Sequence, residues 1–290
     1  MWSAPKARSS GFFREMAANE MQNRYLINGK SEGCLTPFDR GFAYGDGVFR
    51  TLRVKDGTAI GWSRHYLKLR DDCNAIGIVC PSEDILLSDM ALLFEDGGNG
   101  VIKIIVTRGE SARGYAVPAL AQPNRAILRS DLPSYPEKNF TEGVSLHLCR
   151  LRLAAQPLLA GIKHLNRLEN VLARMEWNDP AITDGLLLDQ SGNVIECTMS
   201  NVFMRHGNRL STPDLRHCGV SGLTRERILE IAPGLEFECA IATFNLDTLL
   251  GADEVVICNS LIGVWQVRQL DEHRWQAGML AKQLQNLLNE

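Results

Sequence analysis

The sequence predicts an α+β fold in two domains. Runs of β-branched residues occur between helical patterns without strict β-α-β alternation, which argues against a doubly wound sheet. The segment 131–136 contains two prolines, which cannot join a central sheet and so mark a boundary. We expect an extension over residues 1–22, a small N-terminal α/β domain over 23–131, a linker over 132–138 and a larger, β-rich C-terminal domain over 139–290.

The composition is that of a folded protein with sizeable cores. Of the 290 residues, 45% are hydrophobic and 22% are charged. The net charge of -3 gives no general attraction to nucleic acid or an acidic membrane. The eight cysteines are scattered, without the His/Cys spacing of a zinc site. We therefore expect reduced thiols, a cytoplasmic location, no bound metal, and neither nucleic acid nor membrane as a partner.

In the N-terminal half, local signals predict strands and two helices. Asn28-Gly29 tolerates the positive φ angles of a type I′ turn, so residues 25–27 should open a β-hairpin. Ser63 and Ser82 are suitable N-caps for helices that end near Gly77 and Gly97. The expected strands cover residues 51–54, 58–61, 101–106 and 126–129.

In the C-terminal half, strand patterns dominate. The apolar stripe of Leu165, Leu168, Leu172 and Met175 predicts a helix from about His164 to Trp177. The expected strands cover residues 144–150, 186–188, 194–197, 202–204 and 254–259. Two further helices should span Gly222 to the residue before Pro233 and Met279 to Leu288.

Lys163 follows Ala160-Gly161-Ile162, before the expected start of a helix. A lysine in this position is ordinarily a solvated surface residue. An apolar flank can instead desolvate the ammonium group, lower its pKa and produce the neutral amine that Schiff-base chemistry requires. The position alone leaves both interpretations open.

Glu196 lies in an expected strand, on the same face as Val194 and Thr198 by strand alternation. An exposed strand glutamate is the simpler interpretation. A carboxylate beside a pyridine nitrogen, however, would keep that nitrogen protonated and make the ring a stronger electron sink. A lysine for the aldehyde and an acid for the ring nitrogen are the minimal pair for pyridoxal-phosphate (PLP) chemistry.

A possible anion site combines a flexible turn with the start of a helix at residues 220–225. Free backbone N–H groups there suit a phosphate monoester, although a routine helix cap has the same sequence pattern. Residues just past the strand 254–259 offer side-chain donors to complete the site. The candidate phosphate-binding residues are Ser221, Gly222, Leu223, Thr224, Asn259 and Ser260.

Four motifs in order resemble one family, the fold-type IV PLP enzymes. Residues 39–49, DRGFAYGDGVF, resemble its early signature, and residues 161–169, GIKHLNRLE, resemble the segment around the PLP lysine of aminodeoxychorismate lyases. Residues 195–203 resemble the ring-nitrogen glutamate segment, and 219–225 the phosphate loop. The resemblance runs from about Tyr25 to the C-terminus. It implies PLP as the cofactor, Lys163 as its attachment point and general base, and Glu196 as the partner of the ring nitrogen.

Within this family, the amino-acid sequence of residues 161–169 favours the lyases over D-amino-acid and branched-chain aminotransferases. Residues 107–115 resemble the basic substrate loop of the lyases. Lys103 and Arg113 match lyase positions that hold the dianionic substrate, and two cations suit its two carboxylates. The implied reaction converts 4-amino-4-deoxychorismate to 4-aminobenzoate and pyruvate, for folate biosynthesis. A transaminase is the alternative, and a non-catalytic binding protein of the same fold is a second one.

The resemblance also implies a homodimer in which the small domain covers the partner's cofactor edge. Two residues depart from the family pattern. Lys68 stands where the family has an arginine that grips the cofactor phosphate, and lysine keeps the charge but loses the bidentate fork. The sequence leaves open whether Lys68, Arg64 or Arg70 takes this role. Arg50 replaces a small or acidic residue, which would reshape the pocket.

Overall fold

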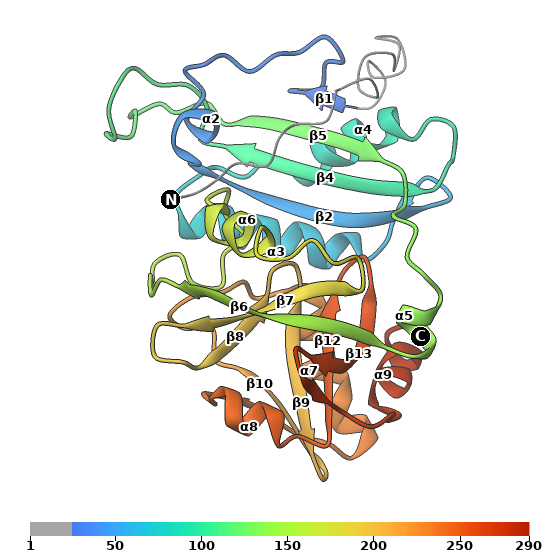
Figure 1. The fold of residues 1–290 in the computed structure, drawn as a ribbon. Coiled ribbons are helices and arrows are strands. Elements are labelled where there is room, and N and C mark those ends of the chain that lie inside the picture. The colour runs from blue at the N-terminus through green and yellow to red at the C-terminus, as the bar shows by residue number, and fades with distance from the viewer. Residues whose placement is uncertain (1–24, 290) are drawn as a thin grey trace, which may run out of the picture.

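The computed structural model describes residues 25–289, which form two β-sheets with helices between and beside them (Figure 1). This arrangement confirms the α+β class. The expected extension over residues 1–22 and the first two residues of the expected N-terminal domain lie outside the described residues. Residues 131–136 connect the two sheets without strand or helix, and the assignment of 132–138 as an interdomain linker stays a prediction.

The N-terminal sheet has five antiparallel strands in the order β1-β5-β4-β2-β3. Its strands are β1 (Tyr25–Ile27), β2 (Gly47–Lys55), β3 (Thr58–Ala59), β4 (Gly100–Thr107) and β5 (Asn124–Ser130). Three helices accompany it: α2 (Arg40–Tyr44), α3 (Trp62–Ala75) and α4 (Glu83–Leu93). The β-branched run of β4 supplies Ile102 and Ile104 to a core with Leu52, Leu69 and Leu86, which explains why this sheet and its helices pack together.

The second sheet has nine strands and follows the order β11-β10-β9-β12-β13-β6-β7-β8, with β14 paired to β13. The strands are β6 (Val144–Leu153), β7 (Ile182–Asp189), β8 (Val194–Cys197), β9 (Asn201–His206), β10 (Arg209–Pro213), β11 (Glu238–Ala242), β12 (Glu254–Asn259), β13 (Gly263–Leu270) and β14 (His273–Arg274). Around them lie α5 (Lys138–Thr141), α6 (Leu168–Arg174), α7 (Leu223–Ile231), the 3-10 turn η1 (Ala232–Leu235), α8 (Leu246–Leu250) and α9 (Leu280–Asn289).

Two expectations for the first sheet need correction. Asn28 and Gly29 do adopt positive φ angles of 51° and 80°. Strand β1 nevertheless pairs with β5, and the expected hairpin is limited to a single bridge between Ile27 and Lys30. Helix α3 has Gly61 as its N-cap, so Ser63 lies inside the helix. Ser82 does occupy the N-cap of α4, although its side chain makes no capping hydrogen bond.

The helix expected over His164 to Trp177 is shorter than predicted. It spans Leu168–Arg174, because His164 forms a β-bridge with Val48 of β2. The apolar stripe that predicted the helix is not buried in this chain, since Leu168 is 68% exposed and Leu172 and Met175 are also exposed.

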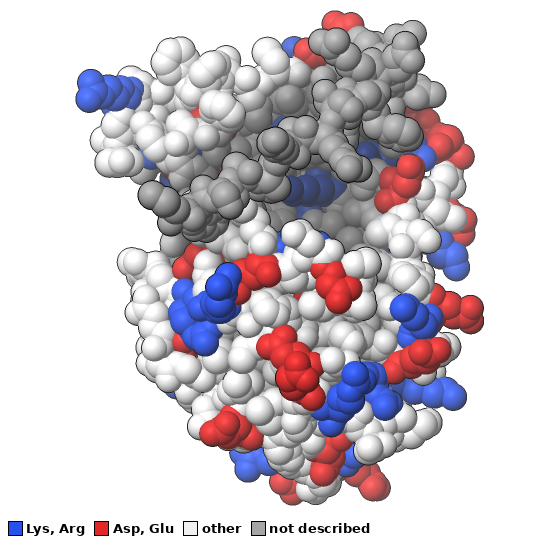
Figure 2. All heavy atoms as spheres, in the orientation of Figure 1, with Lys and Arg blue, Asp and Glu red and all other residues white. Residues whose placement is uncertain are grey.

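On the face shown in Figure 2, acidic and basic side chains interleave over the lower, C-terminal part of the molecule. None of the helices within residues 25–289 is long and apolar enough to cross a lipid bilayer. All eight cysteines lie in this part of the chain, and each is a free thiol.

Candidate active site

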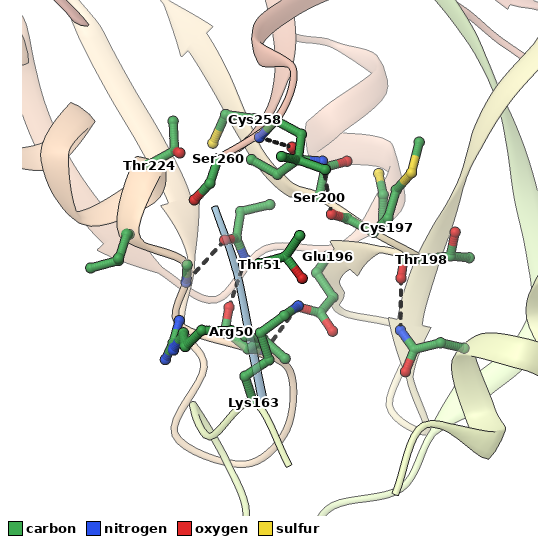
Figure 3. Close-up of a pocket in the computed structure, with 18 of the residues that line it drawn as sticks. Arg50, Thr51, Lys163, Glu196, Cys197, Thr198, Ser200, Thr224, Cys258 and Ser260 are labelled. Carbon is green, nitrogen blue, oxygen red and sulfur yellow. Dashed lines mark hydrogen bonds between the residues drawn. The ribbon is translucent and has the colours of Figure 1, made fainter. Parts of the chain in front are cut away.

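A cavity of about 360 Å³ lies between the two sheets. Its volume falls within the usual range for small-molecule sites, roughly 300–1,000 Å³. Both halves of the chain contribute to its wall (Figure 3). The lining residues that the argument uses are Phe49, Arg50, His65, Lys163, Arg167, Glu196, Gly222, Leu223, Thr224, Asn259 and Ser260.

Lys163 is fixed by elements of the N-terminal half. Its carbonyl accepts a hydrogen bond of 2.9 Å from the backbone N–H of Phe49, in strand β2. Its own N–H points to the carboxylate of Asp72, in α3, at 3.3 Å. The Nζ atom lies 4.6 Å from the centre of the Phe49 ring. The backbone of Lys163 is thus held at both ends, which directs the side chain into the cavity.

The environment of Lys163 favours a neutral amine. Burial, followed by the nearby positive charges of Arg167 and Arg50, lowers its pKa to about 8, against the opposing effects of Glu196 and Asp72. A lysine with this pKa is partly unprotonated near neutral pH and can act as a nucleophile and a base. The interpretation of Lys163 as a surface lysine is therefore not supported.

Glu196 is only 4% exposed, so it is not an exposed strand glutamate. One carboxylate oxygen accepts a hydrogen bond of 2.8 Å from the N–H of Val220. Burial raises the pKa of Glu196 to about 7, and this hydrogen bond and the charges of Arg167 and Lys163 act in the opposite direction. A cationic N–H donor in the cavity would give the carboxylate of Glu196 a second hydrogen bond and stabilise its ionised form.

The loop before α7 is built close to the lysine segment. Gly161 and Val220 form a parallel bridge, in which the N–H of Ser221 donates to the carbonyl of Gly161 at 3.1 Å. Asn201 fixes the next turn, because it accepts from the N–H of Gly222 at 3.1 Å and donates to the carbonyl of Val220 at 2.8 Å. Backbone hydrogen bonds thus join the loop to Gly161, two residues before Lys163.

The six candidate phosphate residues are not equivalent. Ser221 uses its N–H on Gly161 and its hydroxyl on Glu226, and it does not line the cavity. The Oδ1 of Asn259 accepts from the N–H groups of Leu261 and Ile262, and its Nδ2 donates to the carbonyl of Met199. Leu223 and Thr224 stand at the open N-terminus of α7, and Thr224 and Ser260 present hydroxyls to the cavity (Figure 3). These last three residues offer the donors that a phosphate needs.

The cavity fits PLP on three separate grounds. It contains a buried amine of lowered pKa, a buried carboxyl group that still has accepting capacity, and a helix N-terminus with two hydroxyls. A side chain at Gly222 would remove this fit, since its Cβ would come within 2.3 Å of the oxygen of Asn201. The chain has the space and the donors for the cofactor's phosphate at this turn.

The other predicted residues lie outside the cavity wall. The Nζ of Lys68 is bound to Asp72 at 2.6 Å and to the carbonyl of Gly161 at 3.2 Å. The Nζ of Lys103 lies 4.9 Å from the Phe49 ring, whose other contact is Lys163. Arg113 belongs to an exposed loop and lines no part of this cavity.

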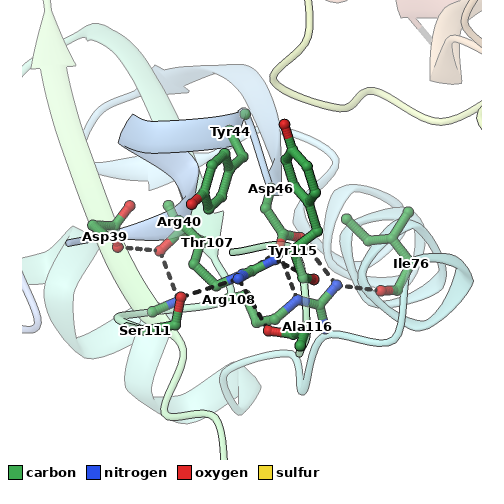
Figure 4. Close-up of polar contacts among 12 residues, drawn as sticks. Asp39, Arg40, Tyr44, Asp46, Ile76, Thr107, Arg108, Ser111, Tyr115 and Ala116 are labelled. Atoms are coloured by element: carbon green, nitrogen blue, oxygen red, sulfur yellow. Dashed lines mark hydrogen bonds and ion pairs between the residues drawn. The ribbon is translucent and has the colours of Figure 1, made fainter. Parts of the chain in front are cut away.

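The DRGFAYGDG motif holds that loop in place (Figure 4). Arg40 pairs with Asp46 at 2.8 Å and donates to the carbonyls of Gly114, Tyr115 and Ala116. Arg108 also pairs with Asp46, at 2.8 Å. The motif thus has a structural role: its arginine anchors the loop that carries Arg113, and its last glycines contact the segment after Lys163, since the carbonyls of Gly47 and Gly45 accept from Leu165 and Asn166.

Sequence reasoning did not identify His65 and Arg167 as cavity residues, and it named Arg50 only as a change that would reshape the pocket. Arg50, His65 and Arg167 bring charge or polarity to the wall. Their neighbours are distant in the chain, so only the spatial arrangement reveals them. The arginine at position 50, where the family pattern has a small or acidic residue, was the one available signal.

The fold and the cavity define a class of enzyme, the PLP-dependent enzymes of fold type IV. The profile of the amino-transferase class IV family matches residues 47–270. The chain is 35% identical over 91% of its length to aminodeoxychorismate lyase of Vibrio harveyi, of which it covers 99%. It is 30% identical over 86% of its length to D-alanine aminotransferase of Bacillus licheniformis, of which it covers 88%.

Among solved structures, 4-amino-4-deoxychorismate lyase from Pseudomonas aeruginosa is similar with a TM-score of 0.87 and 45% identity, covering 91% of this chain and 98% of that one. The chain belongs to the class IV aminotransferase family. It is a PLP-dependent enzyme, as members of this family are.

Proposed function

We propose that this protein converts 4-amino-4-deoxychorismate to 4-aminobenzoate and pyruvate, as a PLP-dependent lyase of folate biosynthesis. The assignment of the substrate rests on the 45% identity to a 4-amino-4-deoxychorismate lyase across 91% of the chain. The cavity supports the chemistry, because Lys163 and Glu196 face the same space.

In this proposal, PLP supplies an electron sink conjugated to the substrate amine. Lys163, with its pKa near 8, removes the proton from the ring carbon that bears this amine. Glu196 keeps the cofactor's ring nitrogen protonated. The C–O bond to the enolpyruvyl group then breaks, the departing group takes up a proton to become pyruvate, and the remaining ring becomes aromatic.

We propose Lys103 and Arg113 as the cations for the two substrate carboxylates. The Nζ atoms of Lys103 and Lys163 lie 4.9 Å and 4.6 Å from the centre of the same Phe49 ring, which places Lys103 close to Lys163. Arg113 projects from an anchored loop that does not line the cavity of its own chain. We propose that it reaches the cavity of a partner in a dimer of two copies of the chain.

A homodimer is also supported by an exposed apolar surface. Phe42 is 77% exposed, and it lines one depression together with Leu168 and Val171 of α6. Exposed apolar groups of this size usually mark a protein interface. The eight free thiols further support a reducing compartment, the cytoplasm, as the working location.

The test supplies the purified protein with PLP and with 4-amino-4-deoxychorismate, made in situ from chorismate and glutamine by its synthase. 4-Aminobenzoate and pyruvate should appear in equal amounts. Lys163→Ala should reduce the rate by about 10³-fold or more, since it removes both base and attachment point. A Lys163→Ala protein that retains the wild-type rate would contradict the mechanism.

The second candidate is a transaminase, which the 30% identity to a D-alanine aminotransferase favours. Incubation with D-alanine or a branched-chain amino acid and a 2-oxo acid separates the two. Rapid amino transfer without formation of 4-aminobenzoate would replace the lyase by the transaminase.

A further inference from the structure

Arg50 is a buried cation at the wall of the cavity. It lies in the middle of strand β2, is 3% exposed and lines the cavity with Lys163, Thr224 and Ser260 (Figure 3). Its Nη2 pairs with the carboxylate of Asp72. Its Nε is buried and has no hydrogen-bond partner in residues 25–289. A buried guanidinium with an unused donor is costly, so this geometry calls for an anion in the cavity.

The charge balance around Asp72 also calls for an anion. This carboxylate is 1% exposed and lies between two cations, Arg50 and Lys68, so one positive charge is left over. Lys68 does not line the cavity, and its Nζ donates to Asp72 and to the carbonyl of Gly161. The uncompensated charge is therefore available to the cavity through Arg50.

His65 places Arg50 at the same end of the cavity as the hydroxyl donors. Its pKa is lowered to about 4 by burial and by the charge of Arg50, so it is neutral and close to this guanidinium. It also lines an adjoining hollow together with Thr224 and Ser260. The remaining cation of the wall, Arg167, donates through Nε and Nη2 to the carbonyls of His164 and Ile162. Arg53, Arg64 and Arg227 line the adjoining hollow but not the cavity. Of the two arginines in the cavity wall, Arg50 is the one with a buried donor that has no partner among residues 25–289.

We propose that Arg50, positioned by Asp72, binds the phosphate of PLP from strand β2, in the role that the sequence suggested for Lys68. This inference rests on the cofactor of the proposed function and not on its substrate. The guanidinium supplies fixed, charge-assisted donors opposite the N–H groups of Leu223 and Thr224. Asp72 holds Arg50 and also contacts the N–H of Lys163 at 3.3 Å, so one carboxylate links the phosphate end to the lysine.

The experiment compares PLP with pyridoxal, which has the aldehyde and ring but no phosphate. Apoprotein is titrated with each, and binding is followed by the change in protein fluorescence and by the absorbance of the bound cofactor. Arg50→Gln should weaken PLP binding by about 10- to 100-fold, the size expected for lost charge-assisted hydrogen bonds. Its affinity for pyridoxal should remain unchanged, which also shows that the variant is folded.

Two matched variants serve as controls. Lys68→Gln removes the other cation on Asp72, and Arg64→Gln removes a surface arginine of the same helix that pairs with Glu230 at 2.8 Å. Both should retain the wild-type ratio of PLP to pyridoxal affinity within about threefold. Arg50→Lys should recover part of the preference for PLP, because the charge returns without the fork.

Three results would overturn the inference. If Arg50→Gln keeps the wild-type preference for PLP while Lys68→Gln loses it, Lys68 is the phosphate ligand. If the wild-type apoprotein binds neither PLP nor pyridoxal, the cofactor of the proposed function is wrong and the role of Arg50 falls with it. Normal PLP preference in Arg50→Gln together with lyase activity would reject only the role of Arg50.

Discussion

At the scale of single residues, the pKa of Lys163 gives a prediction about pH. Its value of about 8 arises from burial first and from Arg167 second. Trapping of PLP on the apoprotein by borohydride, measured by mass spectrometry, should therefore reach half its maximal rate near pH 8. Arg167→Gln removes a repelling positive charge and should move this midpoint upward, by roughly one pH unit or less. A wild-type midpoint above pH 10 would contradict the desolvated lysine.

Glu196 gives a prediction about stability. Its pKa is about 7 in the folded chain against an ordinary value of 4.5, so the folded apoprotein binds a proton that the unfolded chain has lost between these pH values. Its stability must then fall as the pH rises through this window, by at most about 3.5 kcal/mol at roughly 1.4 kcal/mol per pKa unit. Glutamine does not titrate, so the Glu196→Gln protein should not lose stability in this way as the pH rises. The Tm of its apoprotein should exceed that of the wild type at pH 8 but not at pH 4.

The same substitution should act oppositely on catalysis. Glutamine cannot hold the ring nitrogen in its protonated form, so kcat should fall by about 10²-fold or more. A Glu196→Gln protein with wild-type kcat would show that the carboxylate has only a structural role.

At the scale of elements, the turn before α7 depends on a glycine. A Cβ at Gly222 would lie 2.3 Å from the oxygen of Asn201, the same atom that accepts the N–H of Gly222. Gly222→Ala should push the turn away from Asn201 and weaken PLP binding by about tenfold or more. Gly234→Ala is the matched control, because nothing lies within 4 Å of its Cβ. Equal PLP affinities in the two variants would contradict this account of the turn.

Local sequence signals predicted most elements of this fold, and contacts between distant segments explain the misses. The run 101–106 became β4 and the pattern 254–259 became β12, because β-branched residues favour strands wherever they pack. Strand β13 was missed, since its alternating pattern is interrupted by Gln266 and Gln269. The helix after Lys163 starts late because His164 pairs with Val48, a contact that no local pattern reveals.

The same contrast holds for the site. Lys163 and Glu196 could be predicted because they sit in recognisable motifs. Arg50 could not be placed, since its position depends on Asp72, 22 residues further along the chain. The side chains of Ser221 and Asn259 proved to be occupied within the fold, because the loop needs internal hydrogen bonds before it can offer any to a ligand.

At the scale of the whole molecule, the exposed apolar surface predicts a dimer. The protein should elute at about twice 32.2 kDa in gel filtration. Leu168→Glu places a charge in the depression that Phe42 and Val171 line, so it should shift the protein toward the monomer. Ile241→Glu, at an exposed position of β11 on the opposite edge of the nine-stranded sheet, should not. A monomeric wild type would contradict the proposed interface.

The position of Arg113 makes a sharper prediction about how two chains share a site. If Arg113 serves the partner's cavity, Lys163→Ala and Arg113→Ala damage different sites in a mixed dimer. One site then has Lys163 from one chain and Arg113 from the other and is complete. Random assembly makes about half of the dimers mixed, so the mixture should regain about a quarter of wild-type activity. Each variant alone should be nearly inactive.

If Arg113 serves its own chain, both sites of the mixed dimer are defective and no activity returns. Co-expression with two different affinity tags yields the mixed dimer in pure form, which should have about half the wild-type activity per dimer. A dimer of Lys163→Ala with Lys103→Ala adds a comparison within the same assay. Lys103 and Lys163 contact the same Phe49 ring, so both belong to the site of their own chain. In this mixed dimer, one site therefore lacks Lys163 and the other lacks Lys103. That pair should regain no activity, because only a residue supplied across the interface can be complemented.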